Sequence, residues 1–140
     1  MSTVIANWIP SGFHGRLTSW RETNDWPISS TPTSYFLRDG GKLNTSLPTE
    51  ADASVTFLAD PLKPANIPNN KGFPGAADAR KFEEQAEVRT FTTEPLTSPV
   101  EWTGLVKAEL FVTSSAKDSD FIVRVSDVYP DGRSILLVDY

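Results

Sequence analysis

The chain has 140 residues, a formal net charge of −5 and no cysteine, which is enough sequence for one domain with a buried core. The negative charge disfavours nucleic acid as a partner, because phosphates bind surfaces rich in lysine and arginine. No apolar run approaches the roughly 20 residues that cross a bilayer, and the first residues lack the basic and apolar regions of a signal peptide, so no membrane partner is expected. Without cysteine, disulfides and thiolate sites are excluded. The compartment stays open, with the cytoplasm slightly favoured.

The first half of the chain contains only short predicted elements. Residues 1–33 hold three of the four tryptophans but show no sustained hydrophobic period. Short strands are predicted over 34–38 and 53–58, and the glycine pair Gly40-Gly41 predicts a turn. A long loop rich in proline and asparagine follows over 60–74.

The hydrophobic pattern becomes clearer toward the second half. A short, charged, helix-like stretch over 76–88 passes into a strand predicted over 88–93. From residue 105, apolar residues recur at every second position: Val106, Ala108, Leu110 and Val112. This period of two predicts a strand over 105–113.

The last predicted element is a hairpin. Phe121, Val123 and Val125 form the inward row of its first strand, with the intervening polar residues on the other face. The sequence YPDG predicts the turn, because proline presets the backbone and glycine adopts a left-handed conformation. A return strand is predicted over 134–139. Hairpins this short exclude a parallel α/β sheet in this region, so an all-β sandwich of antiparallel strands is the expected fold class.

Several short motifs occur along the chain in an informative order. The earlier ones are Trp20-Arg21 with Asp25-Trp26-Pro27, Tyr35-Phe36-Leu37 with Gly40-Gly41 and Leu43, Asp60-Pro61 with Pro64, and Asp78, Arg80 and Arg89. The most specific are Leu96, Thr103-Gly104, Ser114-Ser115, Asp118-Ser119-Asp120-Phe121 and DVYPDGR. In this order and spacing they resemble the C-terminal β-sandwich domain of the X-Pro dipeptidyl-peptidase and cocaine-esterase-like serine hydrolase family.

This resemblance implies a jelly-roll-like, galactose-binding-like antiparallel sandwich over 20–140, preceded by a connection between domains over 1–19. It also implies a partner, an α/β-hydrolase catalytic domain that carries serine, aspartate and histidine. The G-x-S-x-G nucleophile motif does not occur in this sequence, and the family's sandwich continues for several strands past the position of Tyr140. We therefore expect a sandwich that lacks its last strands, with exposed sheet edges through which a homo-oligomer can form.

One histidine and four aspartates invite a chemical interpretation. His14 is either a catalytic base or an ordinary loop residue, and the second is favoured because a base needs a serine and an orienting carboxylate nearby. The acidic residues close in sequence are Asp118, Asp120, Asp127 and Asp131. Their spacing fits no calcium loop, so turn capping and pairing with nearby arginines are the simpler interpretation. We predict no catalytic, cofactor-binding or metal-binding residues in this chain.

The tryptophans and one loop phenylalanine point to contacts with partners or ligands. Indole faces stack on sugars, so carbohydrate binding is one interpretation of the tryptophans, although it rests on fold analogy. Trp20 and Trp26 match the tryptophans at the start of the family's domain, which implies packing between domains. Phe73 lies in a loop that approaches the mouth of the active site in the family. It is therefore a candidate substrate-pocket residue of an intact enzyme, with a plain surface loop as the alternative.

The sequence as a whole favours the non-catalytic C-terminal domain of a serine ester or peptide hydrolase. Such a domain covers the catalytic domain and shapes substrate access in an intact enzyme, and it is inactive alone. The alternative is an independent β-sandwich module that binds carbohydrate or protein. A third interpretation is an enzyme that a separately encoded hydrolase domain completes in trans.

Overall fold

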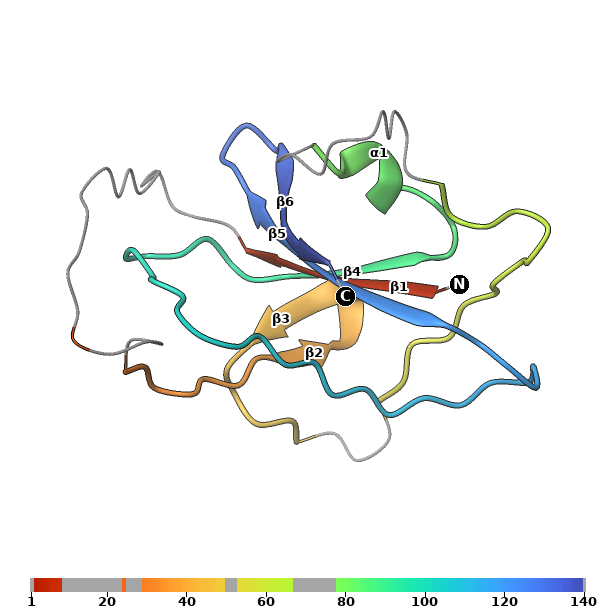
Figure 1. The fold of residues 1–140 in the computed structure, drawn as a ribbon, viewed down its shortest axis with the longest axis horizontal. Coiled ribbons are helices and arrows are strands. Elements are labelled where there is room, and N and C mark those ends of the chain that lie inside the picture. The colour runs from red at the N-terminus through yellow and green to blue at the C-terminus, as the bar shows by residue number, and fades with distance from the viewer. Residues whose placement is uncertain (1, 9–23, 25–28, 50–52, 67–77, 140) are drawn as a thin grey trace.

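In the computed structural model, the described residues form one mixed β-sheet with a single short α-helix (Figure 1). The structure describes residues 2–8, 24, 29–49, 53–66 and 78–139, and for 2–8 and 139 it describes the backbone. The elements are β1 (Ser2–Trp8), β2 (Phe36–Arg38), the 3-10 turn η1 (Asp39–Gly41), β3 (Lys42–Asn44), α1 (Arg80–Glu83), β4 (Val88–Thr92), β5 (Phe121–Val128) and β6 (Ser134–Asp139). The predicted all-β class is confirmed.

The sheet places strands from distant parts of the sequence side by side. Its order is β2-β3-β4-β1-β5-β6. The central strand β1 runs parallel to both β4 and β5, and β3 joins β4 in parallel where Lys42 pairs with Thr92. The outer pairs, β2 with β3 and β5 with β6, are antiparallel hairpins. Local hairpins thus flank a parallel centre, and β2 and β6 form the edges of the sheet that the described residues build.

Glycines with positive φ close both hairpins. Gly40 and Gly41 have φ of 68° and 72°, a backbone conformation that glycine adopts without steric cost. A Cβ atom on Gly41 would lie 3.0 Å from the carbonyl oxygen of Thr90 in β4, so the first hairpin also needs glycine for its close approach to the sheet. In the second hairpin, the Gly132 amide donates a hydrogen bond to the Tyr129 carbonyl oxygen across 2.8 Å. Both turns predicted from the sequence are confirmed.

Helix α1 covers one face of the sheet through Phe82. The Phe82 side chain is 4% exposed and packs with Val88 and the half-buried Ala65. The guanidinium of Arg124, from β5, lies 4.3 Å from the centre of the Phe82 ring. Arg124 is itself 5% exposed, and a cation–π contact is stronger where the cation is shielded from water. This contact joins the helix to the sheet.

The polar row of β5 is more buried than the sequence predicts. Arg124 is 5% exposed and Ser126 is 0% exposed. In the apolar row, Val125 is buried, but Phe121 and Val123 are only half-buried. The prediction that the apolar row alone faces inward is therefore wrong. The physical reason is that α1 packs over the row that contains Arg124, and alternation by itself does not reveal which row a helix will cover.

The opposite face of β4 contacts an irregular segment. Arg89 follows Val88 in the strand, so its side chain points to the other face of the sheet. There its guanidinium lies 4.8 Å from the centre of the Phe57 ring. Figure 1 shows the segment around Phe57 as a ribbon without strand arrows. An irregular segment thus contacts this face of the sheet without forming a strand.

Two strands predicted from alternation, over 53–58 and 105–113, are absent from the structure, and these predictions are wrong. Several of their large apolar side chains are exposed: Leu58 is 83%, Leu105 87% and Phe111 94% exposed. Phe57 and Leu110 are half-buried. A period of two specifies that side chains alternate, but a strand also needs a neighbour for its backbone hydrogen bonds. Within the described part of the chain, the sheet does not extend to these segments.

The other predicted elements are recovered with small shifts. The strands over 34–38, 88–93 and 134–139 correspond to β2, β4 and β6, and the helix-like stretch contains the four residues of α1. The strand β1 lies in a region for which no strand was expected. The boundary between a connection and a sandwich domain at 19–20 stays a prediction, as does the two-layer jelly-roll arrangement. No helix in the described ranges is long and apolar enough to span a bilayer.

Replacing Phe82 by alanine tests the core. Phe82→Ala is expected to lower the free energy of unfolding by about 3–5 kcal/mol, because it removes a buried ring and leaves a cavity. The matched change Phe111→Ala removes a side chain that is 94% exposed and should alter that energy by less than about 0.5 kcal/mol. Urea unfolding followed by tryptophan fluorescence measures both. Similar effects of the two changes would contradict the assignment of Phe82 to the core.

Candidate functional site

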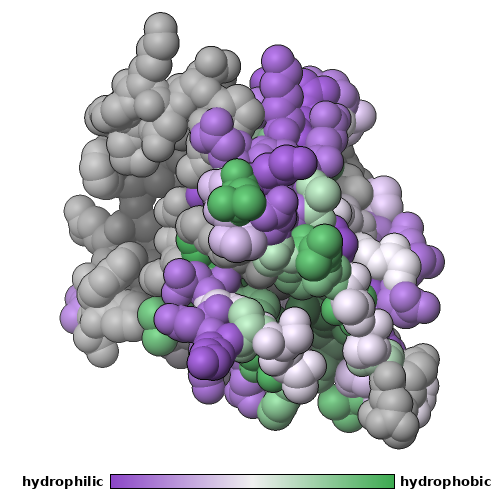
Figure 2. All heavy atoms as spheres, turned by 90° about the vertical axis from the view of Figure 1, so that its right-hand side faces the viewer, coloured by the Kyte–Doolittle hydropathy of each residue, from purple (hydrophilic) through white to green (hydrophobic). Residues whose placement is uncertain are grey.

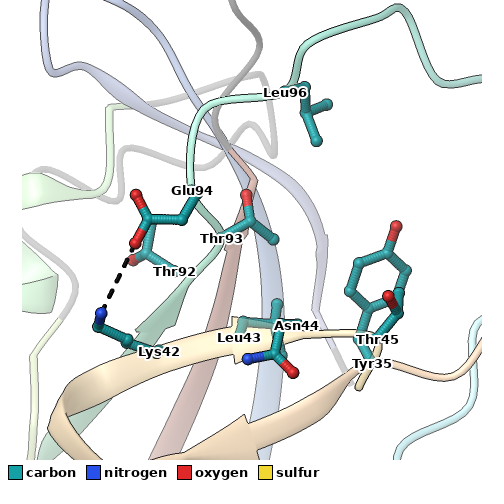
Figure 3. A pocket seen from close by; sticks show the side chains of 9 residues that line it. All are labelled: Tyr35, Lys42, Leu43, Asn44, Thr45, Thr92, Thr93, Glu94 and Leu96. Atoms are coloured by element: carbon teal, nitrogen blue, oxygen red, sulfur yellow. Dashed lines mark ion pairs between the residues drawn. The ribbon is translucent and has the colours of Figure 1, made fainter.

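An open pocket of about 440 Å³ lies where the β2–β3 hairpin meets the end of β4. Figure 3 shows the side chains that line it: Tyr35 before β2; Lys42, Leu43, Asn44 and Thr45 from β3 and the residue after it; and Thr92, Thr93, Glu94 and Leu96 from the end of β4 onward. The parallel pairing of Lys42 with Thr92 brings the two segments together. The most buried members are Leu43, 5% exposed, and Thr93, 7% exposed. The pocket therefore has a fixed interior and an open mouth.

The Lys42–Glu94 ion pair and the aromatic ring of Tyr35 lie on different sides of this pocket (Figure 3). Lys42 Nζ lies 3.7 Å from Glu94 Oε1, and the two side chains are 68% and 84% exposed. A pair this exposed stabilises the fold by no more than about 1 kcal/mol, so both charged groups can rearrange around a ligand. The Tyr35 ring lies across the pocket, with its centroid 6.5 Å from that of Trp102. Desolvation raises the pKa of the Tyr35 phenol above its ordinary value.

A second polar cluster joins α1 to the β5–β6 hairpin. The Asp78 carboxylate accepts hydrogen bonds from Arg80 Nε at 2.9 Å and Nη2 at 2.6 Å, and from the Ser134 amide at 3.3 Å. The side-chain hydrogen bond from Arg80 is the largest cause of a lowered Asp78 pKa, about 2. The Ser134 hydroxyl donates in turn to the Glu83 carboxylate on α1. The hydrogen bonds run in a chain from Arg80 through Asp78 and Ser134 to Glu83. We interpret this cluster as a clamp that fixes the helix.

The acidic residues named in the sequence serve different local purposes. Asp131 accepts a hydrogen bond from Arg133 Nε across 2.8 Å, and the Arg133 guanidinium lies 4.9 Å from the centre of the Tyr129 ring. The predicted pairing within the hairpin is confirmed for Asp131. Asp118 and Asp120 are exposed ahead of β5. Across the ranges that the structure describes, no group of three or more histidine, cysteine, aspartate or glutamate side chains is placed to hold a metal ion.

Other residues named in the sequence lie outside the described ranges: His14, Trp20, Trp26 and Phe73. Their roles stay predictions. Trp102, by contrast, is described and 44% exposed, and it contacts Tyr35 at the pocket. Sequence reasoning did not find this pocket, because its walls come from segments that only the sheet brings together. The one available signal was the aromatic Trp102, which was considered among the tryptophans as a possible sugar platform.

The fold and the pocket define an all-β domain with an open cavity of mixed polar and apolar lining where β3 meets the end of β4. Comparison with known protein families identifies the family of this chain. Residues 7–139 match the X-Pro dipeptidyl-peptidase C-terminal non-catalytic domain, and the chain belongs to this family. The match confirms the resemblance read from the motifs. It also confirms that this stretch of sequence is not itself an enzyme, because the family is described as non-catalytic.

Curated relatives are longer proteins. The cocaine esterase of a Rhodococcus species is 40% identical over 139 residues, an alignment that covers 88% of this chain and 24% of the esterase. Proteins named as serine esterases from Mycobacterium bovis and Mycobacterium tuberculosis are each 30% identical over 120 residues, which cover 81% of this chain and 19% of the relative. The chain thus spans about a quarter or less of these relatives. No solved structure matches it.

The Asp78 clamp makes stability depend on pH. Its folded pKa of about 2 lies below the value of about 3.9 for an unfolded aspartate, so the stabilisation is present above about pH 4 and is lost as the pH falls toward 2. Asp78→Asn should lower the free energy of unfolding at neutral pH by about 1 kcal/mol, a modest amount because 34% of the side chain is exposed.

Unfolding measured by circular dichroism from neutral to acidic pH checks this effect. The difference between Asp78→Asn and the unaltered chain should shrink as the pH approaches the folded pKa. Asp118→Asn, at an exposed position, is the matched control and should have little effect at any pH. A deficit for Asp78→Asn that stays constant across the acidic range would contradict the clamp.

Proposed function

We propose that this chain acts as the accessory C-terminal domain of an α/β-hydrolase-type serine hydrolase that cleaves esters or peptides. The observation that carries the proposal is the family match over residues 7–139. The names of the relatives, a cocaine esterase and two serine esterases, add support for a serine hydrolase of the ester-cleaving kind. The partner is then the catalytic domain of the same enzyme, with the triad outside this chain.

Exposed apolar side chains support a polypeptide partner. Leu105, Phe111 and Val112 are 87%, 94% and 53% exposed, although they lie in a segment with the alternation of a buried strand. Figure 2 shows hydrophobic residues at the surface in several separate patches between hydrophilic ones. Apolar surface of this kind is stabilised when another chain covers it. We assign the segment 105–113 to contact with the remainder of the hydrolase.

In this arrangement the domain covers part of the catalytic domain and shapes the entrance for substrate. Loops outside the sheet would then lie nearest to the active site, and Phe73 is the residue that we place at the substrate pocket. Trp20 and Trp26 would pack between the two domains. The domain contributes position and shape to catalysis, while the nucleophile, base and orienting carboxylate come from its partner.

A chimeric esterase tests this function. The aligned region of the Rhodococcus cocaine esterase is replaced by residues 7–139 of this chain, and reaction with a fluorophosphonate is followed by intact mass. The chimera should form one adduct, on its catalytic part, whereas the isolated 140-residue chain should form none. In the chimera, Leu105→Asp combined with Phe111→Asp should lower the melting temperature by several degrees, because charges then enter a contact between domains.

The control for the chimera is Leu47→Asp, at a side chain that is 75% exposed on the loop after β3. It should leave the melting temperature unchanged. An adduct on a serine of the isolated chain would contradict the accessory role. So would a chimera that fails to react, or one in which the double change and the control behave alike.

Association of two copies through a sheet edge is a second contact that the structure favours. Strand β6 is the last strand of the sheet formed by the described residues. Its first residues, Ser134 and Ile135, already pair with the segment at Asp78 and Ala79, so the proposed contact uses its second half, where Leu137 is 55% exposed. An edge strand offers backbone donors and acceptors to a further strand. A symmetric pair of β6 strands would give a dimer.

Sedimentation velocity over a range of concentrations measures this association. The isolated chain should form a dimer as its concentration rises, and Leu137→Lys should shift it to the monomer, because a charged side chain at the edge opposes strand pairing. Leu62→Lys, at a side chain that is 90% exposed and outside the sheet, should leave the dimer intact. A chain that stays monomeric throughout would rule this contact out.

A further inference from the structure

We propose that the pocket between β3 and the end of β4 binds a neutral saccharide. The proposal rests on three features: the hydrogen-bonding groups of the lining, the aromatic rings of Tyr35 and Trp102, and the size of the cavity. It does not depend on the accessory role, because the pocket is formed within this chain. Nothing in the family's description assigns a ligand to it.

The side chains that line the pocket include both hydrogen-bond donors and hydrogen-bond acceptors. Asn44 carries both, and Lys42 donates while Glu94 accepts. The threonine hydroxyls of the lining, at positions 45, 92 and 93, can do either. Carboxylates and phosphates only accept, and ammonium groups only donate. A ligand that matches the whole set must itself both donate and accept at several points, which is the property of adjacent hydroxyl groups.

The charge of the lining opposes an ionic ligand. Lys42 and Glu94 are the charged members, and they lie 3.7 Å apart with opposite signs. An anion would gain from Lys42 but meet repulsion from Glu94, and a cation would meet the reverse. A neutral hydroxyl can accept from the ammonium and donate to the carboxylate without separating the pair. The ion pair therefore selects for a ligand without net charge.

The aromatic residues supply a surface for the apolar face of a sugar ring. Tyr35 lines the pocket, and its ring is tilted by 51° against that of Trp102 at 6.5 Å between centroids. Trp102 is 44% exposed, so part of this corner meets solvent beside the pocket. Sugar rings present C–H groups on one face, and these pack on aromatic faces that carry partial negative charge. Leu96 and the buried Leu43 add apolar contact within the cavity.

The cavity volume suits a small ligand. Pockets that bind small molecules generally measure about 300–1,000 Å³, and this one measures about 440 Å³. Its lining combines polar and apolar surface, which suits a sugar, because a sugar ring has hydroxyl groups at its edge and C–H groups on its face. The position at the end of the sheet leaves the mouth open to a sugar at the end of a longer glycan.

NMR titration of the 140-residue chain with neutral sugars tests the proposal. The probes are glucose, galactose, mannose, maltose, lactose and cellobiose, with glycine as a zwitterion and inorganic phosphate as an anion. At least one sugar should shift the backbone amide signals of Asn44, Thr45 and Thr93 in a saturable way. If glycine or phosphate shifts these signals and no sugar does, or if no probe does, the proposal is wrong.

A matched pair of substitutions ties the binding to the pocket. Thr45→Val removes one hydroxyl from the lining and should weaken sugar binding about threefold to tenfold, the effect of one lost hydrogen bond. Thr113→Val makes the same chemical change at an exposed residue outside the pocket and should leave binding unchanged. Trp102→Leu should also weaken binding. Each variant keeps its fold if its amide spectrum remains dispersed, and equal affinities across the set would overturn the assignment.

Discussion

The contact between Phe82 and Arg124 holds the described structure together, because it joins the only α-helix of the described residues to the sheet. A helix of four residues is too short to be stable by itself. Two contacts fix its position. The buried Phe82 ring lies against the buried Arg124 guanidinium, 4.3 Å from the ring centre, and the Asp78 clamp holds the start of the helix. A buried cation needs compensation from its surroundings, so β5 and α1 depend on each other.

The other face follows from this arrangement. Helix α1 packs on the face of the sheet that contains Arg124. On the opposite face, irregular segments contact β4, and Phe57 in one of them stacks on Arg89. Phe57 is half-buried by this contact, whereas Leu58, Leu105 and Phe111 remain exposed. The face that points away from α1 is nevertheless buried, since Phe91 and Val125 on it are each 5% exposed. The exposed apolar side chains include Leu58, Leu105 and Phe111 of the irregular segments. These exposed side chains are the basis for the proposed contact with the remainder of a hydrolase.

Sequence reasoning succeeded where structure is local. The hairpins at Gly40-Gly41 and at YPDG were predictable because the turn residues sit next to the strands that they join. It failed for β1, whose parallel neighbours β4 and β5 lie far along the chain, and for 105–113, where alternation indicates two faces but not a pairing partner. The pocket could not be predicted for the same reason, because Lys42 and Thr92 are brought together only by strand pairing in the sheet. The family, in contrast, was accessible because its motifs are read in order along the chain.

Amide hydrogen exchange on the isolated 140-residue chain tests the central claim, that the described residues form one hydrogen-bonded sheet and that the segment 105–113 lies outside it. Amides in β4 and β5 should be strongly protected, because they belong to the interior of the sheet. Amides of residues 105–113 should exchange at rates close to those of an unfolded peptide. Protection of 105–113 equal to that of β5 would mean that this segment already has a strand partner within the chain, and the claim that it lies outside the sheet would be contradicted.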